Sequence, residues 1–212
     1  MKLDPFIIIQ FTALIFSITI HEASHAFIAD KCGDPTARNL GRVTINPLPH
    51  MDLLGTIIIP LTMMIFSPGI ALIGWGKPCP VNPLNFNNRE RDDMLISFAG
   101  PFSNFLAALA SVLIVKILLL IGIHSTGTFA LFRALISINL ILIVFNLIPI
   151  PPLDGSHILR QLLPEKQKTI FDMLDRWGIL ILLIFVNTPL FALFYRILAK
   201  PILSLFNYII LL

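Results

Sequence analysis

Residues 21–25 read His-Glu-Ala-Ser-His, and no other part of the sequence is better suited to bind a metal and activate water. Side chains four residues apart lie on the same face of a helix, so the imidazoles of His21 and His25 can converge on one ion. Glu22 follows the first histidine and can reach a water molecule bound to that ion. The motif therefore predicts a catalytic zinc centre with a general base beside it.

The residues that flank this motif strengthen the prediction. The stretch 6–29 is predominantly apolar and long enough to cross a bilayer as a helix. Ionisable side chains inside such a helix are costly, and by default they mark a functional site. The alternative is a buried polar cluster that only ties helices together, and the combination of cost and spacing argues against it.

A catalytic zinc ion usually takes three protein ligands and a water molecule, so the motif needs one more ligand. Asp154 is the only carboxylate at the end of one of the other apolar segments, and three prolines shortly before it must break the helix. A broken helix at membrane depth is tolerated where it is buried in protein or lines a cavity. Taken alone, Asp154 is also typical of a turn, because Asp-Gly is a common turn pair. Its pairing with the histidine motif favours the metal-ligand interpretation.

The composition of the whole chain indicates a membrane protein. Of 212 residues, 56% are hydrophobic and 13% are charged, whereas soluble domains carry roughly 25% charged residues. The apolar segments that are long enough to span a bilayer, or that contain such a span, are 6–29, 94–122, 129–150 and 177–199. We expect an all-α polytopic membrane protein with about four to six transmembrane helices. Residues 1–212 are expected to form one domain, with a catalytic core at about 6–160 and C-terminal helices at about 177–212.

The predicted site constrains how the helices cross the membrane. The histidine motif lies near the far end of the helix at 6–29, and Asp154 lies just past the end of the helix at 129–150. The two can meet only if these helices run in the same direction, which requires one spanning segment between them.

Two apolar segments compete for that single crossing. The segment 94–122 is the longer and cleaner of them, whereas prolines and glycines interrupt 53–75. We therefore expect 53–75 to be re-entrant, turning near Pro68 and Gly69 and returning to its starting side. The alternative is a full span with a kink, because Pro and Gly are tolerated in membrane helices.

The polar connections carry the basic residues. With a re-entrant segment, the stretches 30–52, 77–93 and 155–176 share one side of the membrane and carry ten Lys or Arg residues. Cytoplasmic loops are enriched in Lys and Arg, so the active site is expected near the cytoplasmic face. The same residues account for the net charge of +3, and no nucleic-acid partner is expected.

Residues 42–50 form a distinct part of the first polar connection. They hold β-branched residues followed by two prolines, which predicts a short strand or turn rather than a helix. His50 at the end of this stretch is expected to be a solvated loop residue, with a role in shaping a gate as the alternative.

On these residues the chain resembles the site-2 proteases, which are intramembrane zinc metalloproteases of peptidase family M50. The resemblance rests on the His-Glu-Ala-Ser-His motif, the Asn-x-x-Pro-x-Pro-Pro-Leu-Asp-Gly run at 146–155, and the Ala-Gly-Pro-Phe-Ser-Asn run at 99–104. The three pieces occur in the family's order and span most of the first 155 residues.

The resemblance implies hydrolysis of peptide bonds within or beside the bilayer. It assigns one zinc ion per chain to His21, His25 and Asp154, and general-base chemistry to Glu22. It also implies that Asn146 is an asparagine near the active site that stabilises the transition state. The substrates implied are membrane-spanning or membrane-associated proteins or peptides, and the location expected is the plasma membrane of a prokaryotic cell. The chain lacks the PDZ or CBS domain of larger members, and no oligomeric state is indicated.

A second class of function remains open, namely a membrane zinc carrier or a scaffold that holds zinc without catalysis. Transporters also place histidine and carboxylate groups in membrane helices. Such a site has no need of Glu22 beside the first histidine, whereas water activation has.

Overall fold

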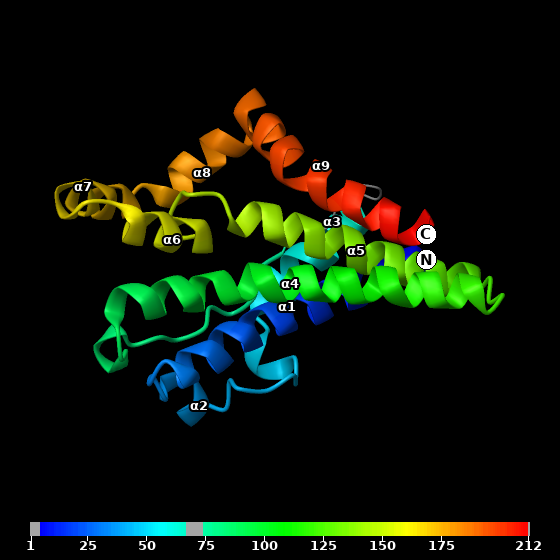
Figure 1. Cartoon of the computed structure of the whole chain (residues 1–212), viewed down its shortest axis with the longest axis horizontal. Coiled ribbons are helices and arrows are strands. Elements are labelled where there is room, and N and C mark those ends of the chain that lie inside the picture. The colour runs from blue at the N-terminus through cyan, green and yellow to red at the C-terminus, as the bar shows by residue number, and fades with distance from the viewer. Residues whose placement is uncertain (1–4, 67–73, 212) are drawn as a thin grey trace.

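The computed structural model describes residues 5–66 and 74–211, and these residues form a helical protein (Figure 1). Four helices in the described part are long and apolar enough to cross a membrane. They are α1 (Pro5–Lys31), α4 (Arg89–Leu120), α5 (Thr126–Asn146) and α9 (Pro189–Leu211). The expected all-α polytopic architecture is confirmed.

Shorter helices connect these four. Between α1 and α4 lie α2 (Thr36–Asn39), η1 (Leu48–His50), η2 (Leu53–Ile58), α3 (Ile59–Phe66) and η3 (Pro83–Asn85). Between α5 and α9 lie α6 (Asp154–Leu162), α7 (Glu165–Asp175) and α8 (Gly178–Val186).

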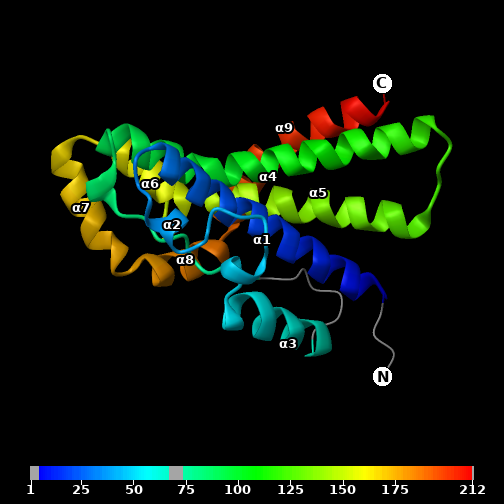
Figure 2. The ribbon, with the colours of Figure 1, turned by 90° about the horizontal axis from the view of Figure 1, so that it is seen from below.

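The helices α1, α4 and α5 pack side by side as the centre of the fold. Figure 2 shows α1 and α5 running in the same direction with α4 opposite to both, as the site requires. Small residues allow the helix backbones to approach closely, and on α1 Ala13, Ser17 and Ala29 are fully buried. On the outside, α9 packs through Ala199 against α5 and through Phe206 against α4.

Local capping fixes where α1 ends and α4 begins. Gly33 has φ +99° and follows the end of α1, where Asp34 N–H bonds to the Ala29 carbonyl oxygen, a pairing typical of a glycine-terminated helix. At the start of α4, the Asn88 side chain accepts a hydrogen bond from Arg91 N–H.

Asp34 then joins the two polar connections to each other. Its buried carboxylate accepts hydrogen bonds from Asn82 N–H and from the Asn85 side-chain amide. Burial opposes the charge, but these bonds and those from Thr36 hold the pKa of Asp34 below its ordinary value. The stretches that follow α1 and precede α4 therefore lie on the same side of the bundle.

The segment 53–75 leaves and returns at one place. Met51 and Gly76 form an isolated antiparallel bridge, and the Thr56 hydroxyl donates to the Trp75 carbonyl oxygen at 2.7 Å. The helices η2 and α3 have six and eight residues, about 20 Å of rise in total, which is short of the roughly 30 Å hydrocarbon slab.

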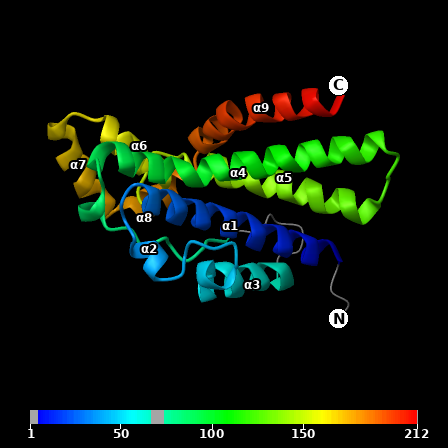
Figure 3. The same ribbon diagram turned by 60° about the horizontal axis from the view of Figure 1, so that its bottom comes forward.

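The two described ends of the segment therefore lie together, which agrees with the expected re-entrant path better than with a kinked span, and α3 lies beside α1 (Figure 3). The turn expected near Pro68 and Gly69 lies outside the described residues.

Two sequence predictions need correction. Residues 42–50 form bends and the short helix η1, and within the described ranges the only β pairing is the bridge at Met51, so the turn forms and the strand does not. The apolar segment expected within 177–199 is split at Asn187 and Thr188, because Pro189 starts a new helix there. The candidate span is Pro189–Ile210, and α8 is too short to cross.

Cysteine labelling can test the re-entrant path. In a chain carrying Cys32→Ser and Cys79→Ser, single cysteines at the exposed positions Asn39→Cys and Leu84→Cys should react with an impermeant thiol reagent from the same side. His124→Cys, in the loop between α4 and α5, should react from the opposite side and serves as the control. Reaction of positions 39 and 84 from opposite sides would rule out the re-entrant path.

Candidate metal centre

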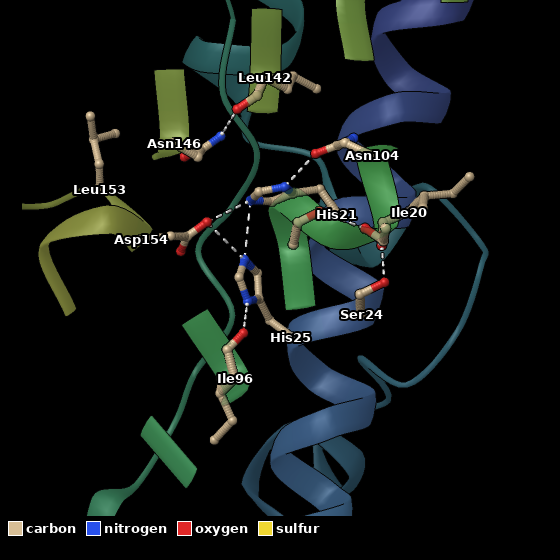
Figure 4. Close-up of polar contacts among 12 residues, drawn as sticks. Ile20, His21, Ser24, His25, Ile96, Asn104, Leu142, Asn146, Leu153 and Asp154 are labelled. Atoms are coloured by element: carbon tan, nitrogen blue, oxygen red, sulfur yellow. Dashed lines mark hydrogen bonds and ion pairs between the residues drawn. The ribbon is translucent and has the colours of Figure 1, made fainter. Parts of the chain in front are cut away.

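The two histidines of the motif lie one turn apart in the second half of α1 and point toward the same place. Both are buried, with 6% of His21 and 7% of His25 exposed. Their rings meet edge to face, and the two Nε2 atoms are 3.1 Å apart (Figure 4). The expected convergence of the imidazoles is therefore present in the structure.

Asp154 reaches the same place from a distant part of the chain. It is the first residue of α6, after a short turn region that follows α5. Its Oδ2 atom lies 3.3 Å from His21 Nε2 and 3.5 Å from His25 Nε2. Gly155 makes this position reachable, because a Cβ atom there would lie 2.5 Å from the Leu147 carbonyl group.

The other ring nitrogens show which way the imidazoles are protonated. His25 Nδ1 lies 2.7 Å from the Ile96 carbonyl oxygen, which can only accept, so this nitrogen carries the hydrogen. His21 Nδ1 lies 2.7 Å from Asn104 Oδ1, while the Asn104 side-chain nitrogen donates to Ser17 O and Asn139 Oδ1. In their neutral forms both imidazoles therefore present an unprotonated Nε2 to the centre.

These three atoms fit a metal ion. Ligand atoms at about 2.0–2.2 Å from a tetrahedral zinc ion lie about 3.3–3.6 Å from one another. The distances among His21 Nε2, His25 Nε2 and Asp154 Oδ2 are 3.1, 3.3 and 3.5 Å. Asp154 Oδ2 is buried and has no hydrogen-bond partner among the described residues, which leaves its lone pairs for a cation. Two imidazoles and a carboxylate are also a ligand set that zinc uses.

Glu22 occupies the next position on α1 and faces the re-entrant segment. It is half-buried, and its Cγ atom lies 3.0 Å from the place where a Cβ atom of Gly76 would stand. Its carboxylate makes no hydrogen bond within residues 5–66 and 74–211, so it is not committed to a structural partner.

Asn146 is the last residue of α5 and is half-buried (Figure 4). Its side-chain nitrogen donates to the Leu142 carbonyl oxygen at 3.0 Å. An amide nitrogen has two hydrogens, so one remains for another acceptor.

Three features of the site were not predicted as parts of it. Gly100 lets α4 approach the histidines, because a Cβ atom there would lie 2.4 Å from both His21 Cε1 and His25 Nε2. The Ile96 carbonyl oxygen and the Asn104 amide hold the ring orientations. The only sequence signal was that Gly100 and Asn104 lie in the Ala-Gly-Pro-Phe-Ser-Asn run, and a backbone carbonyl leaves no such signal.

The prediction that His50 is a solvated loop residue is wrong. His50 is 1% exposed and not solvated, because the preceding turn closes over its ring and Nε2 donates to the Thr44 carbonyl oxygen at 2.8 Å. Burial lowers the pKa of His50, so the neutral form is favoured. Its backbone carbonyl accepts from Lys77 N–H and lies 3.2 Å from the Cβ position of Gly76, beside Glu22.

His157, in contrast, is not brought to the centre. Its Nδ1 atom lies 3.6 Å from Asp93 Oδ1, and its side chain is 52% exposed. The nearby Asp93 carboxylate raises the pKa of His157 above its ordinary value. The neighbouring Gln161 also donates to Asp93, so α6 is tied to the first turns of α4.

Comparison with known proteins identifies the family of this chain. The family model described as Peptidase family M50 matches residues 114–185. The chain is 36% identical over 195 residues to "Putative zinc metalloprotease YwhC" of Bacillus subtilis (strain 168), covering 90% of this chain and 84% of that protein. It is 30% identical over 184 residues to "Putative zinc metalloprotease Rip2" of Mycolicibacterium smegmatis (strain ATCC 700084 / mc(2)155), covering 82% of this chain and 65% of that protein. No solved structure matches the chain.

The close approach at Gly100 leads to a testable prediction. Gly100→Ala should weaken zinc binding by about 10–100-fold, because the added methyl group must displace the imidazoles of His21 and His25. Competition between the purified protein and a chromogenic zinc chelator measures the affinity. Gly127→Ala is the matched control, since no atom lies within 4 Å of its Cβ position. Equal zinc affinity in the two variants would show that α4 does not set the ligand geometry.

Proposed function

Because this chain belongs to peptidase family M50 and is a membrane zinc metalloprotease, we propose that His21, His25 and Asp154 hold one zinc ion and that Glu22 is the general base. The observation that carries the proposal is the convergence of three ligand atoms from α1 and α6 in an apolar bundle. A cluster of this kind is costly in a membrane unless a cation joins it.

The chemistry proposed is hydrolysis of a peptide bond. A zinc ion bound by these ligands would polarise the scissile carbonyl and acidify water. Glu22 accepts a proton from the attacking water and passes it to the departing amine nitrogen. The C–N bond then breaks, and the products are a carboxylate and an amine. In support, Glu22 is adjacent to the first ligand, and its carboxylate has no structural hydrogen bond within the described ranges.

Asn146 is proposed to stabilise the charge that develops on the carbonyl oxygen. Its amide has one hydrogen beyond that bonded to Leu142, and it lies at the end of the helix that leads to Asp154. A fixed donor of this kind acts on the transition state more than on the substrate.

The proposed substrates are membrane-spanning or membrane-associated proteins, cleaved at the cytoplasmic face of a prokaryotic plasma membrane. The support is that the basic polar connections gather at the end of the bundle where α1 finishes. All proposed catalytic residues lie within the core at 6–160 of a single membrane domain.

The competing function is a zinc carrier or a zinc-holding scaffold. Such a protein would need the three ligands but would not need a base beside them. Glu22 therefore separates the two functions.

Glu22→Gln should bind zinc within about twofold of the wild type but lose cleavage of a membrane substrate by at least about 100-fold, because the amide cannot accept the water proton. Zinc content and release of a reporter from a single-span substrate in lipid vesicles are the measurements. Glu165→Gln, at a side chain that is 83% exposed, is the matched control. Wild-type cleavage by Glu22→Gln would support a carrier or scaffold.

Asn146→Ala should slow cleavage by about 10²–10³-fold, the range seen when one oxyanion donor is removed. Zinc affinity should remain near the wild-type value, because no hydrogen bond among the described residues joins Asn146 to the three proposed ligands. Single-turnover cleavage and chelator competition on the same preparation separate the two effects. A loss of zinc without a change in the rate of the zinc-loaded protein would assign Asn146 to the metal site.

A further inference from the structure

A chain of buried amides extends from His21 through the interior of the bundle. Asn104 on α4, Asn139 on α5 and Ser17 on α1 are all 0% exposed. Polar side chains among packed apolar helices are retained at a cost unless they bond to one another. Beyond holding helices together, these side chains connect α5 to His21.

Each hydrogen of the Asn104 amide has its own acceptor. Its side-chain nitrogen donates to Asn139 Oδ1 at 2.7 Å and to the Ser17 carbonyl oxygen at 3.1 Å. With the nitrogen held there, Oδ1 must point to His21 Nδ1, 2.7 Å away. The orientation of this amide therefore determines that Nδ1 carries the hydrogen and that Nε2 is free to bind metal.

Asn139 is fixed in its turn. Its side-chain nitrogen donates to the Leu135 carbonyl oxygen at 2.8 Å and to Ser17 Oγ at 2.9 Å. Its Oδ1 atom is therefore presented to Asn104 as an acceptor only. Without that acceptor, the Ser17 carbonyl oxygen alone holds the Asn104 nitrogen, so it costs less for the amide to rotate by half a turn and direct its N–H₂ group at His21 Nδ1. The imidazole would then carry its hydrogen on Nε2, where it blocks a metal.

We infer that Asn139 is a positioning residue for the metal centre: it touches no ligand, yet it selects the metal-binding tautomer of His21 through Asn104. The inference rests on the proposed zinc site. Through Asn139, the helix α5 helps to hold His21, in addition to leading the chain toward Asp154.

The test replaces Asn139 in the full-length protein, purified in lipid nanodiscs and freed of metal. Asn139→Leu keeps the volume and removes the acceptor, and it should weaken zinc binding by about tenfold or more in chelator competition. In Asn139→Asp, burial favours the protonated carboxyl, which keeps an acceptor oxygen toward Asn104 and a donor toward the Leu135 carbonyl oxygen, so this variant should bind zinc within about threefold of the wild type. Thermal unfolding of the metal-free proteins measures any purely structural effect.

Asn187→Leu is the matched control. Asn187 also donates to a carbonyl oxygen four residues earlier, at 2.8 Å, and among the described residues none of its hydrogen bonds leads to the proposed metal centre. Zinc affinity of Asn139→Leu no weaker than that of Asn187→Leu would overturn the inference, as would an Asn139→Asp variant as weak as Asn139→Leu. If the wild type itself binds no zinc, the proposed metal site is wrong, and that outcome is distinct from a failure of the tautomer argument.

Discussion

The structure depends on one constraint, which is that three electron-pair donors from two separate parts of the chain meet in an apolar bundle. Two unprotonated imidazole nitrogens and a carboxylate oxygen lie 3.1–3.5 Å apart, where they would repel one another without a cation between them. In lipid no bulk water can relieve such a cluster. The site is therefore stable only if the surrounding helices hold each donor and a positive charge joins them.

Most of the contacts that hold the two imidazoles come from one face of the helix α4. Ile96, Gly100 and Asn104 follow one another at intervals of four residues, so they lie in a row along the helix. The first supplies a carbonyl acceptor for His25, the second leaves space for both rings, and the third accepts from His21. One helix thus fixes the separation and the protonation of both imidazoles.

Much of this could be predicted from the sequence, because the dominant signals are local. Apolar length identified α1, α4 and α5, and the spacing of His21 and His25 requires only a helix. The need for Asp154 to reach them then implied the parallel course of α1 and α5 and the re-entrant path of 53–75.

Other features depend on contacts that no local pattern encodes. The burial of His50 follows from how a turn folds over it. The role of Asn139 becomes visible only when its partner Asn104 and the ring of His21 are in place. Polar residues in membrane helices can therefore be flagged from sequence, but their partners cannot.

The three proposed ligands are positioned from two different environments. The histidines are held within the apolar bundle, whereas Asp154 is the first residue of α6, a short helix that also makes polar contacts. His157 and Gln161 of α6 reach Asp93 of α4, and the next helix bonds to α4 through Lys168 and Glu90. These contacts lie at the polar end of the bundle, so the third ligand is secured by interactions that salt and solvent can reach. The proposed metal site therefore joins an apolar half to a polar half whose attachment depends partly on charge.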